Sequence, residues 1–128
     1  MKTVSILGVT GSIGASSLKV IDNNIYELNL LSFSTYSNID KLLKLIDKYN
    51  PEYAVVTDTD IMLKYFGEYE HQFKNTKIYS GNDGLLRICS DKRNDIILNA
   101  VSGKAGLMPS YYILENGINL ALANKESI

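Results

Sequence analysis

Residues 3–21 read TVSILGVTGSIGASSLKVI, and this stretch decides the fold. The β-branched run at 3–7 predicts a short strand, and residues 12–21 predict a helix. Between them lies the turn 8–14, GVTGSIG, with glycines at its first, fourth and last positions. A glycine-rich turn that joins a strand to a helix is typical of dinucleotide-binding folds.

The three glycines of this turn each suit a separate task in binding a pyrophosphate. Gly8 permits a tight turn, Gly11 lets the backbone approach the anion, and Gly14 lets the helix pack closely on the sheet. The free N–H groups at the start of the helix face the anion, and the hydroxyls of Thr10 and Ser12 can add hydrogen bonds. The spacing G-x-x-G-x-x-G departs from the usual G-x-G-x-x-G. A glycine-rich turn without a ligand is the competing interpretation.

Strand-like and helix-like segments alternate along the rest of the chain. Further strands are predicted at 27–33, 53–57, 77–79, 95–100 and 118–123. Further helices are predicted between the cap residue Asn38 and Pro51, from Asp58 or Thr59 towards Glu70, from Asn82 or Asp83 onwards, and around Pro109 up to Gly117. This alternation predicts an α/β fold, a doubly wound, mostly parallel Rossmann-like sheet with helices on both faces. We expect one domain over residues 1–128.

The composition excludes several other classes of protein. With 45% hydrophobic and 21% charged residues, the chain is of the globular type. Its 13 basic and 14 acidic residues form no long basic run, so no nucleic-acid partner is expected. No apolar stretch suits a membrane span or a signal peptide. The single cysteine, Cys89, favours a cytoplasmic location. We expect Cys89 to be a buried, inert thiol and His71 to be a solvated surface residue.

The end of the second predicted strand bears on the choice between NAD and NADP. An NAD site usually carries Asp or Glu here, and an NADP site carries Arg or Lys. Residues 32–38, SFSTYSN, contain neither, and the nearest basic residue is Lys41. A helix N-terminus can hold a 2′-phosphate through backbone N–H groups, with Ser37 and Asn38 assisting. Because no carboxylate is present to repel that phosphate, the sequence favours NADP. Ordinary capping of the helix by Ser37 or Asn38 is compatible with this role.

Three motifs in order resemble the 1-deoxy-D-xylulose 5-phosphate reductoisomerase family. They are ILGVTGSIG at 6–14, SGKAGLMP at 102–109 and LANKES at 122–127, and together they cover essentially the whole chain. The resemblance implies the NADPH-binding domain of an oxidoreductase. That enzyme isomerises and reduces 1-deoxy-D-xylulose 5-phosphate to 2-C-methyl-D-erythritol 4-phosphate, in the non-mevalonate route to isoprenoids. For the full-length enzyme it also implies a divalent metal (Mg or Mn), a phosphorylated sugar substrate and a cytoplasmic homodimer.

The resemblance implies cofactor contacts at two places in the chain. Around the pyrophosphate and the adenosine, the implied contacts are Thr10, Gly11, Ser12, Ile13 and Asn38. On the nicotinamide side they are Asn124 and Glu126. Lys125 would reach the substrate, since an ammonium group at the end of a strand suits a phosphate. We expect no catalytic residue and no metal ligand in this chain, because the family's metal ligands, phosphate-binding residues and active-site lid lie beyond position 128.

Tyr36 and Ser37 depart from the family pattern, which commonly has a glycine followed by a basic or small residue before the asparagine. Tyr36 offers a ring that could stack on the adenine.

The chain ends directly after a predicted strand, where the ligand crevice of such a sheet lies. We therefore expect a truncated protein that binds cofactor without turnover. Two alternatives remain: the nucleotide domain of another NAD(P)-dependent dehydrogenase, such as a semialdehyde dehydrogenase, and a non-catalytic nucleotide-sensing module complete at 128 residues. The Asn-Lys-Glu-Ser ending speaks against the first, and the abrupt end speaks against the second.

Overall fold

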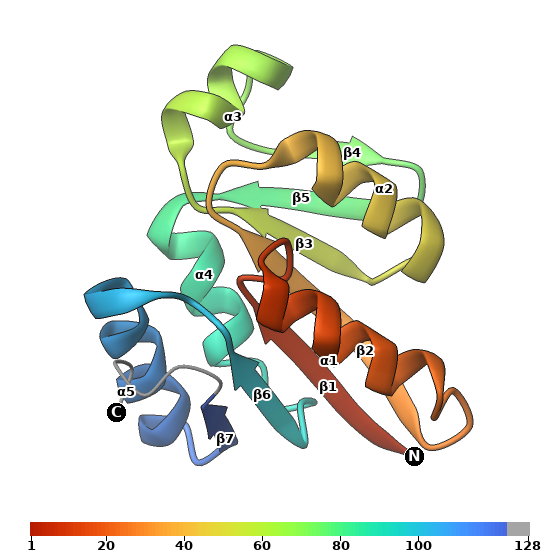
Figure 1. Cartoon of the computed structure of the whole chain (residues 1–128). Helices are drawn as coiled ribbons and strands as arrows, with labels where there is room; N and C mark the ends of the chain where they lie inside the picture. Colours follow the sequence, from red (N-terminus) through yellow and green to blue (C-terminus); the bar gives the residue numbers. More distant parts are fainter. Residues whose placement is uncertain (123–128) are drawn as a thin grey trace.

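The structure, a computed structural model, describes residues 1–122. These residues form a seven-stranded sheet in the order β4-β5-β3-β2-β1-β6-β7 (Figure 1). The strands are β1 (Lys2–Leu7), β2 (Leu28–Thr35), β3 (Tyr53–Val56), β4 (His71–Phe73), β5 (Thr76–Ser80), β6 (Ile96–Asn99) and β7 (Asn119–Leu122). The helices are α1 (Ser12–Asp22), α2 (Ile39–Tyr49), α3 (Thr59–Phe66), α4 (Gly81–Cys89) and α5 (Leu107–Glu115), with a short 3₁₀ turn, η1 (Gly103–Gly106).

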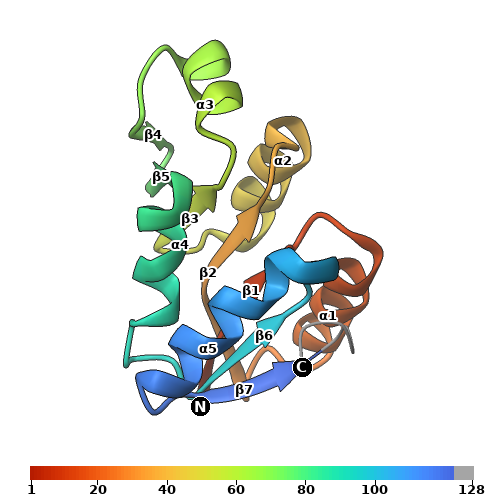
Figure 2. The same cartoon turned by 90° about the vertical axis from the view of Figure 1, so that its left-hand side faces the viewer.

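Helices cover both faces of the sheet, as Figure 2 shows from its edge. On one face α1, α2 and α3 bury residues such as Leu18, Leu42 and Met62 against the strands. On the other face α4 and α5 bury Ile88 and Ile113. All neighbouring strands run parallel except β4 and β5. The predicted doubly wound, mostly parallel sheet is therefore confirmed.

The helix boundaries follow from local sequence signals. The apolar residues Ile39, Leu42, Leu43 and Ile46 recur at helical spacing, which predicts one buried face of α2. In the structure Ile39, Leu42 and Ile46 are buried and Leu43 is partly buried. The Asn38 side chain caps this helix by accepting a hydrogen bond from the Lys41 N–H at 3.1 Å. Asp58 caps α3 in the same way, accepting from N–H groups in the first turn of that helix. No helix among residues 1–122 is long and apolar enough to cross a membrane.

The region between α3 and β5 differs from the prediction. The sequence predicts a helix running towards Glu70, but α3 ends at Phe66, where Gly67 takes the left-handed conformation (φ 76°) that stops a helix. The chain then forms β4, an antiparallel edge strand that the sequence pattern does not indicate. His71 begins this strand and is half-buried: its ring stacks on Phe66 with centroids 4.1 Å apart, and its Nδ1 lies 2.8 Å from a Glu68 oxygen. His71 is thus a surface residue whose ring is partly covered by these two neighbours.

Cys89 is the last residue of α4, and it is fully buried in the core. Burial raises the pKa of its thiol to about 12. At neutral pH the thiol is therefore protonated and a poor nucleophile, as expected from the sequence.

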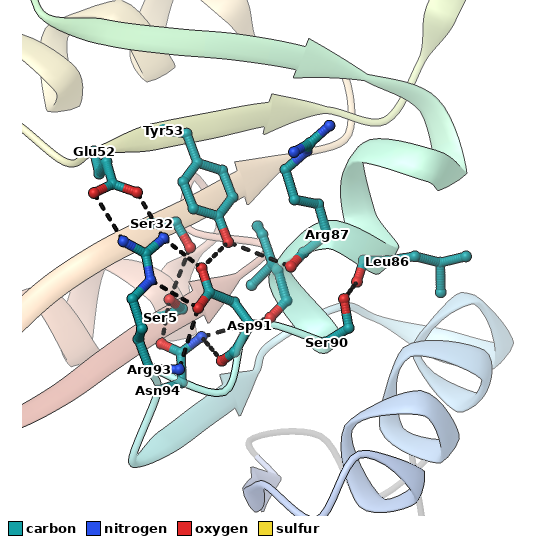
Figure 3. A network of polar contacts seen from close by, with 11 residues as sticks. Ser5, Ser32, Glu52, Tyr53, Leu86, Arg87, Ser90, Asp91, Arg93 and Asn94 are labelled. Carbon is teal, nitrogen blue, oxygen red and sulfur yellow. Dashed lines mark hydrogen bonds and ion pairs between the residues drawn. The ribbon is translucent and has the colours of Figure 1, made fainter.

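A polar network ties the end of α4 to the sheet, away from the carboxyl ends of the strands (Figure 3). Arg93 binds the Glu52 carboxylate through two nitrogens at 2.9 and 2.6 Å and also contacts Asp91 at 2.7 Å. The Tyr53 hydroxyl donates to the same Asp91 carboxylate at 2.9 Å. Arg93 holds the pKa of the Asp91 carboxyl below its usual value. Beside this group, Ser5 donates to Asn94 at 2.6 Å.

Replacing Asp91 should show how much this network stabilises the domain. Asp91→Asn leaves the Arg93 guanidinium and the Tyr53 hydroxyl with weaker partners, so the free energy of unfolding at pH 7 should fall by roughly 1–3 kcal/mol. Because folding lowers the Asp91 pKa, its contribution is complete above the ordinary value of 3.8 and is lost as the pH falls through the folded-state value. Urea unfolding of both chains should therefore show a difference that shrinks below pH 3.8.

Asp47→Asn provides the control for this experiment. It breaks the exposed ion pair between Asp47 of α2 and Lys74, which lies between β4 and β5, and the loss should stay within about 0.5 kcal/mol. A difference between the Asp91→Asn chain and the unmodified chain that persists unchanged into acid would contradict the role of the Asp91 charge.

Candidate dinucleotide site

The candidate site lies at the carboxyl edge of the sheet, where β1, β2 and β6 end side by side. In open parallel sheets this edge forms the ligand crevice. Here β1 runs directly into the glycine turn, which leads into α1, and the two neighbouring strands end at Thr35 and Asn99.

Two glycines of the turn are required by the fold itself. Gly8 adopts φ +76°, and a Cβ there would lie 3.0 Å from the Ala100 carbonyl oxygen. At Gly14 a Cβ would lie only 2.3 Å from the Val9 carbonyl oxygen. These glycines allow the turn to pass close to the end of β6 and α1 to pack onto the turn.

Gly11 is different, because nothing in the described protein requires a glycine there. Its φ of −81° is open to any residue, and a Cβ at this position would lie 3.8 Å from its nearest neighbour, the Gly8 carbonyl oxygen. Gly11 occupies the N-cap position of α1, and no side chain within residues 1–122 caps that helix. The first N–H groups of α1 thus remain available, and the space above Gly11 is kept open.

The opposite wall of the site comes from α4 and from the segment between β6 and α5. Asn99, fully buried at the end of β6, organises this segment. Its side-chain amide donates to the Gly106 carbonyl and to the Ser110 hydroxyl, both at 2.8 Å, and its oxygen accepts from the Val101 N–H at 3.1 Å. These bonds hold the segment 100–106 facing the glycine turn.

The two walls enclose a cavity of about 650 Å³. This volume is in the range of small-molecule and cofactor sites. The lining residues are Gly8, Thr10, Gly11, Ser34, Tyr36, Thr57, Asn82, Leu85, Leu86, Ala100, Val101, Ser102, Lys104, Ala105, Met108 and Pro109. Among these described residues none is acidic, and Lys104 is a cation. The cavity combines an apolar side at α4 and α5 with a polar, acid-free side at the glycine turn, which suits an anionic ligand carrying a planar base.

A smaller hollow of about 450 Å³ adjoins this cavity at the start of α4 and shares Asn82 with it. Arg87 lines this hollow and lies over the Tyr79 ring, 4.0 Å from its centroid. Because Glu70 and Asp83 also line it and no glycine turn faces it, the larger cavity is the candidate site.

Hydrogen bonds join the end of β2 to the glycine turn. The hydroxyls of Thr10 and Thr35 lie 2.7 Å apart, and the Asn38 N–H donates to the Thr35 hydroxyl at 3.3 Å. Lys41, in the first turn of α2, reaches across and donates to the Thr10 carbonyl at 2.7 Å. The N-terminus of α2 is thereby held beside the glycine turn.

The predicted site residues divide into three groups. Thr10 and Gly11 line the cavity itself. Ser12, Ile13, Ser37 and Asn38 do not line it but lie within two positions of the lining residues Gly11 and Tyr36. Asn38 uses its side chain to cap α2. Asn124, Lys125 and Glu126 lie outside the described residues.

Sequence reasoning missed the second wall of the cavity. The segment 102–109 carries a family motif, but no binding role was predicted for it. A signal was present: residues that directly follow a parallel strand next to β1 must lie opposite the glycine turn. The contribution of Leu85 and Leu86 from α4 had no such signal, because it depends on where the helix crosses the sheet.

The different environments of the glycines predict different effects on stability. Gly14→Ala places a Cβ 2.3 Å from the Val9 carbonyl oxygen, so it should lower the free energy of unfolding by roughly 2–4 kcal/mol or prevent folding. Gly11→Ala should cost less than about 1 kcal/mol, as expected for an N-cap exchange without a clash. Thermal unfolding followed by circular dichroism measures both. Equal losses for the two variants would contradict the assignment of Gly11 to a ligand and not to the fold.

Comparison with known proteins agrees with this geometry. A family model of 1-deoxy-D-xylulose 5-phosphate reductoisomerase matches residues 4–128. The reductoisomerase of Clostridium kluyveri is 40% identical over all 128 residues, and that of Thermodesulfovibrio yellowstonii is 38% identical over 127. A crystal structure of DOX-P reductoisomerase in complex with NADPH, fosmidomycin and magnesium superposes with a TM-score of 0.83 at 31% identity, over 99% of this chain and 31% of that one. The Zymomonas mobilis enzyme in complex with NADPH gives 0.80 at 29% identity, over 98% of this chain and 32% of that one.

The fold and the glycine turn define a Rossmann-like, dinucleotide-binding domain. The chain belongs to the 1-deoxy-D-xylulose 5-phosphate reductoisomerase family. It spans about a third of the length of the curated relatives that it matches: 33% of the Clostridium kluyveri protein and 32% of the Thermodesulfovibrio yellowstonii protein.

Proposed function

We propose that residues 1–128 form the NADPH-binding domain of a 1-deoxy-D-xylulose 5-phosphate reductoisomerase. The pyrophosphate lies over Gly11, bonded by the free N–H groups at the start of α1, with Ser12 and Ile13 beside it. The adenosine lies between the end of β2 and the apolar wall formed by Leu85, Leu86 and Met108. The adenine ring can stack on Tyr36, whose side chain is exposed at the rim.

The observation that carries this proposal is the environment of Gly11. A glycine with an ordinary φ, no close neighbour and a place in the wall of a cavity has no role in the fold. Its place at the uncapped end of α1 leaves several N–H donors facing the same space. An anionic group that needs close backbone contact explains both features.

The reaction of the full-length protein is inferred from its relatives. One matched structure holds NADPH, fosmidomycin and magnesium, and another holds NADPH. For the full-length protein we accordingly infer reduction and isomerisation of 1-deoxy-D-xylulose 5-phosphate to 2-C-methyl-D-erythritol 4-phosphate, in a cytoplasmic homodimer without membrane or nucleic-acid partners. Asn124 and Glu126 are proposed contacts on the nicotinamide side, and Lys125 is a proposed substrate contact.

We propose that the divalent metal of the family is held by residues of the full-length protein outside this chain. No group of three or more His, Cys, Asp or Glu side chains within residues 1–122 is arranged to hold a metal ion. The proposal therefore assigns only cofactor binding to this domain, and we expect the 128-residue chain to bind NADPH without turnover.

Titration of the 128-residue chain with NADPH and NADH by calorimetry tests the proposal. NADPH should bind at least about tenfold more tightly than NADH, a difference of about 1.4 kcal/mol. Gly11→Ala should weaken NADPH binding by about tenfold or more, because its Cβ enters the space of the pyrophosphate, while thermal stability stays nearly unchanged. Tighter binding of NADH would favour the nucleotide domain of another dehydrogenase. Absence of binding to either cofactor would contradict the proposal.

A further inference from the structure

The ammonium group of Lys41 lies at the junction of the two elements that would face the adenosine. Lys41 belongs to the first turn of α2, and its Nζ donates to the carbonyl oxygen of Thr10 in the glycine turn at 2.7 Å. The two residues are 31 positions apart in the chain. In dinucleotide-binding sheets the end of the second strand faces the adenosine ribose, and here that strand ends at Thr35, next to Thr10.

Among the described residues at the end of β2 and the start of α2, residues 32–41, Lys41 is the only basic one. Ser37, which precedes Asn38, is neutral, so the backbone N–H groups at the start of α2 lack a basic side chain directly before them. The Asn38 side-chain oxygen is occupied by the Lys41 N–H as a helix cap. Lys104 lines the cavity from the opposite wall. Lys41 is thus the cation that the fold places beside the end of β2.

The charge of Lys41 is not matched by a carboxylate. Within residues 1–122 Lys41 forms no ion pair, and its ammonium group bonds to a neutral carbonyl. Two acidic residues near this junction have other partners: Asp40, which precedes Lys41 in the chain, and Asp58, whose N–H bonds to the Tyr36 carbonyl. Asp40 accepts a hydrogen bond from the Tyr65 hydroxyl at 3.1 Å, and Asp58 caps α3. The ammonium group is exposed, has three donors and uses one of them here.

We propose that Lys41 recognises the 2′-phosphate of NADPH and so sets the preference for NADPH over NADH. This role rests on the proposed function of the cavity. When the phosphate binds, the ammonium group exchanges a hydrogen bond to a neutral carbonyl for a charge-assisted one, or keeps both, and charge-assisted bonds are the stronger kind. The N–H groups at the start of α2 complete the phosphate site. Lys41, in the first turn of α2, thus supplies the positive charge that the neutral Ser37 does not provide.

The test uses adenosine-end probes, because the nicotinamide contacts lie outside the described residues. The full 128-residue chain is titrated with 2′,5′-ADP, which carries the 2′-phosphate, and with 5′-AMP, which does not. Lys41→Met should weaken 2′,5′-ADP binding about tenfold, as expected for one exposed charge-assisted bond, and leave 5′-AMP binding within about twofold. Lys41→Arg should retain most of the affinity. The preference of the unmodified chain for 2′,5′-ADP should also decline with added salt.

Lys44→Met is the matched control. Lys44 is exposed on the same helix one turn further on, so the variant removes the same charge away from the glycine turn. It should leave both affinities nearly unchanged, which separates a local contact from a general loss of positive potential.

Other outcomes overturn the inference in distinguishable ways. If Lys41→Met weakens both probes equally, Lys41 only braces the glycine turn, and NADPH binding by the domain stands. If Lys44→Met has the same effect as Lys41→Met, the general positive potential around α2, and not a contact with Lys41, selects the phosphate. If the unmodified chain binds neither probe and no NADPH, the proposed function fails, and the role of Lys41 fails with it.

Discussion

The close approach of α1 to the turn that precedes it is the constraint on which the site depends. At Gly14 the helix backbone lies so near the Val9 carbonyl that no side chain fits between them. Val9 is itself fully buried, and its N–H is fixed to the Ser34 carbonyl of β2 at 2.8 Å. The helix is therefore clamped to the ends of two strands. These contacts fix the orientation of α1, so that its first N–H groups lie over the sheet edge, where the cavity is.

The two ends of the sheet satisfy their polar groups in opposite ways. Near the amino ends, the charged groups are paired with one another in the network of Arg93, Asp91, Glu52 and Tyr53. At the carboxyl ends, donors remain unused and acidic groups are turned elsewhere. Such incompleteness costs stability in the free protein and is characteristic of functional sites.

Local patterns predicted the elements whose determinants are local. The buried stripe of α2 follows the spacing of Ile39, Leu42 and Ile46, and the glycine turn indicates both the strand before it and the helix after it. β4 was not predicted, because three residues are too few to show the alternation of a strand. Its extended conformation is instead stabilised by pairing with β5. The reach of Lys41 to Thr10 was also not predictable, since it depends on how α2 packs beside the turn. Packing distances of this kind arise only when distant segments meet.

The strand order has a consequence for how the domain is made. β1 is the first strand of the chain, yet it pairs with β6 through contacts such as Val4 with Ile96, about ninety positions apart. During synthesis the glycine turn leaves the ribosome long before the facing segment that begins at Ala100. β1 has only one of its two neighbouring strands until nearly all of residues 1–100 are available, a topology associated with slow, non-local folding. The two walls of the candidate cavity are thus synthesised at different times, and a nascent fragment that ends before Ala100 lacks the wall formed by residues 100–109.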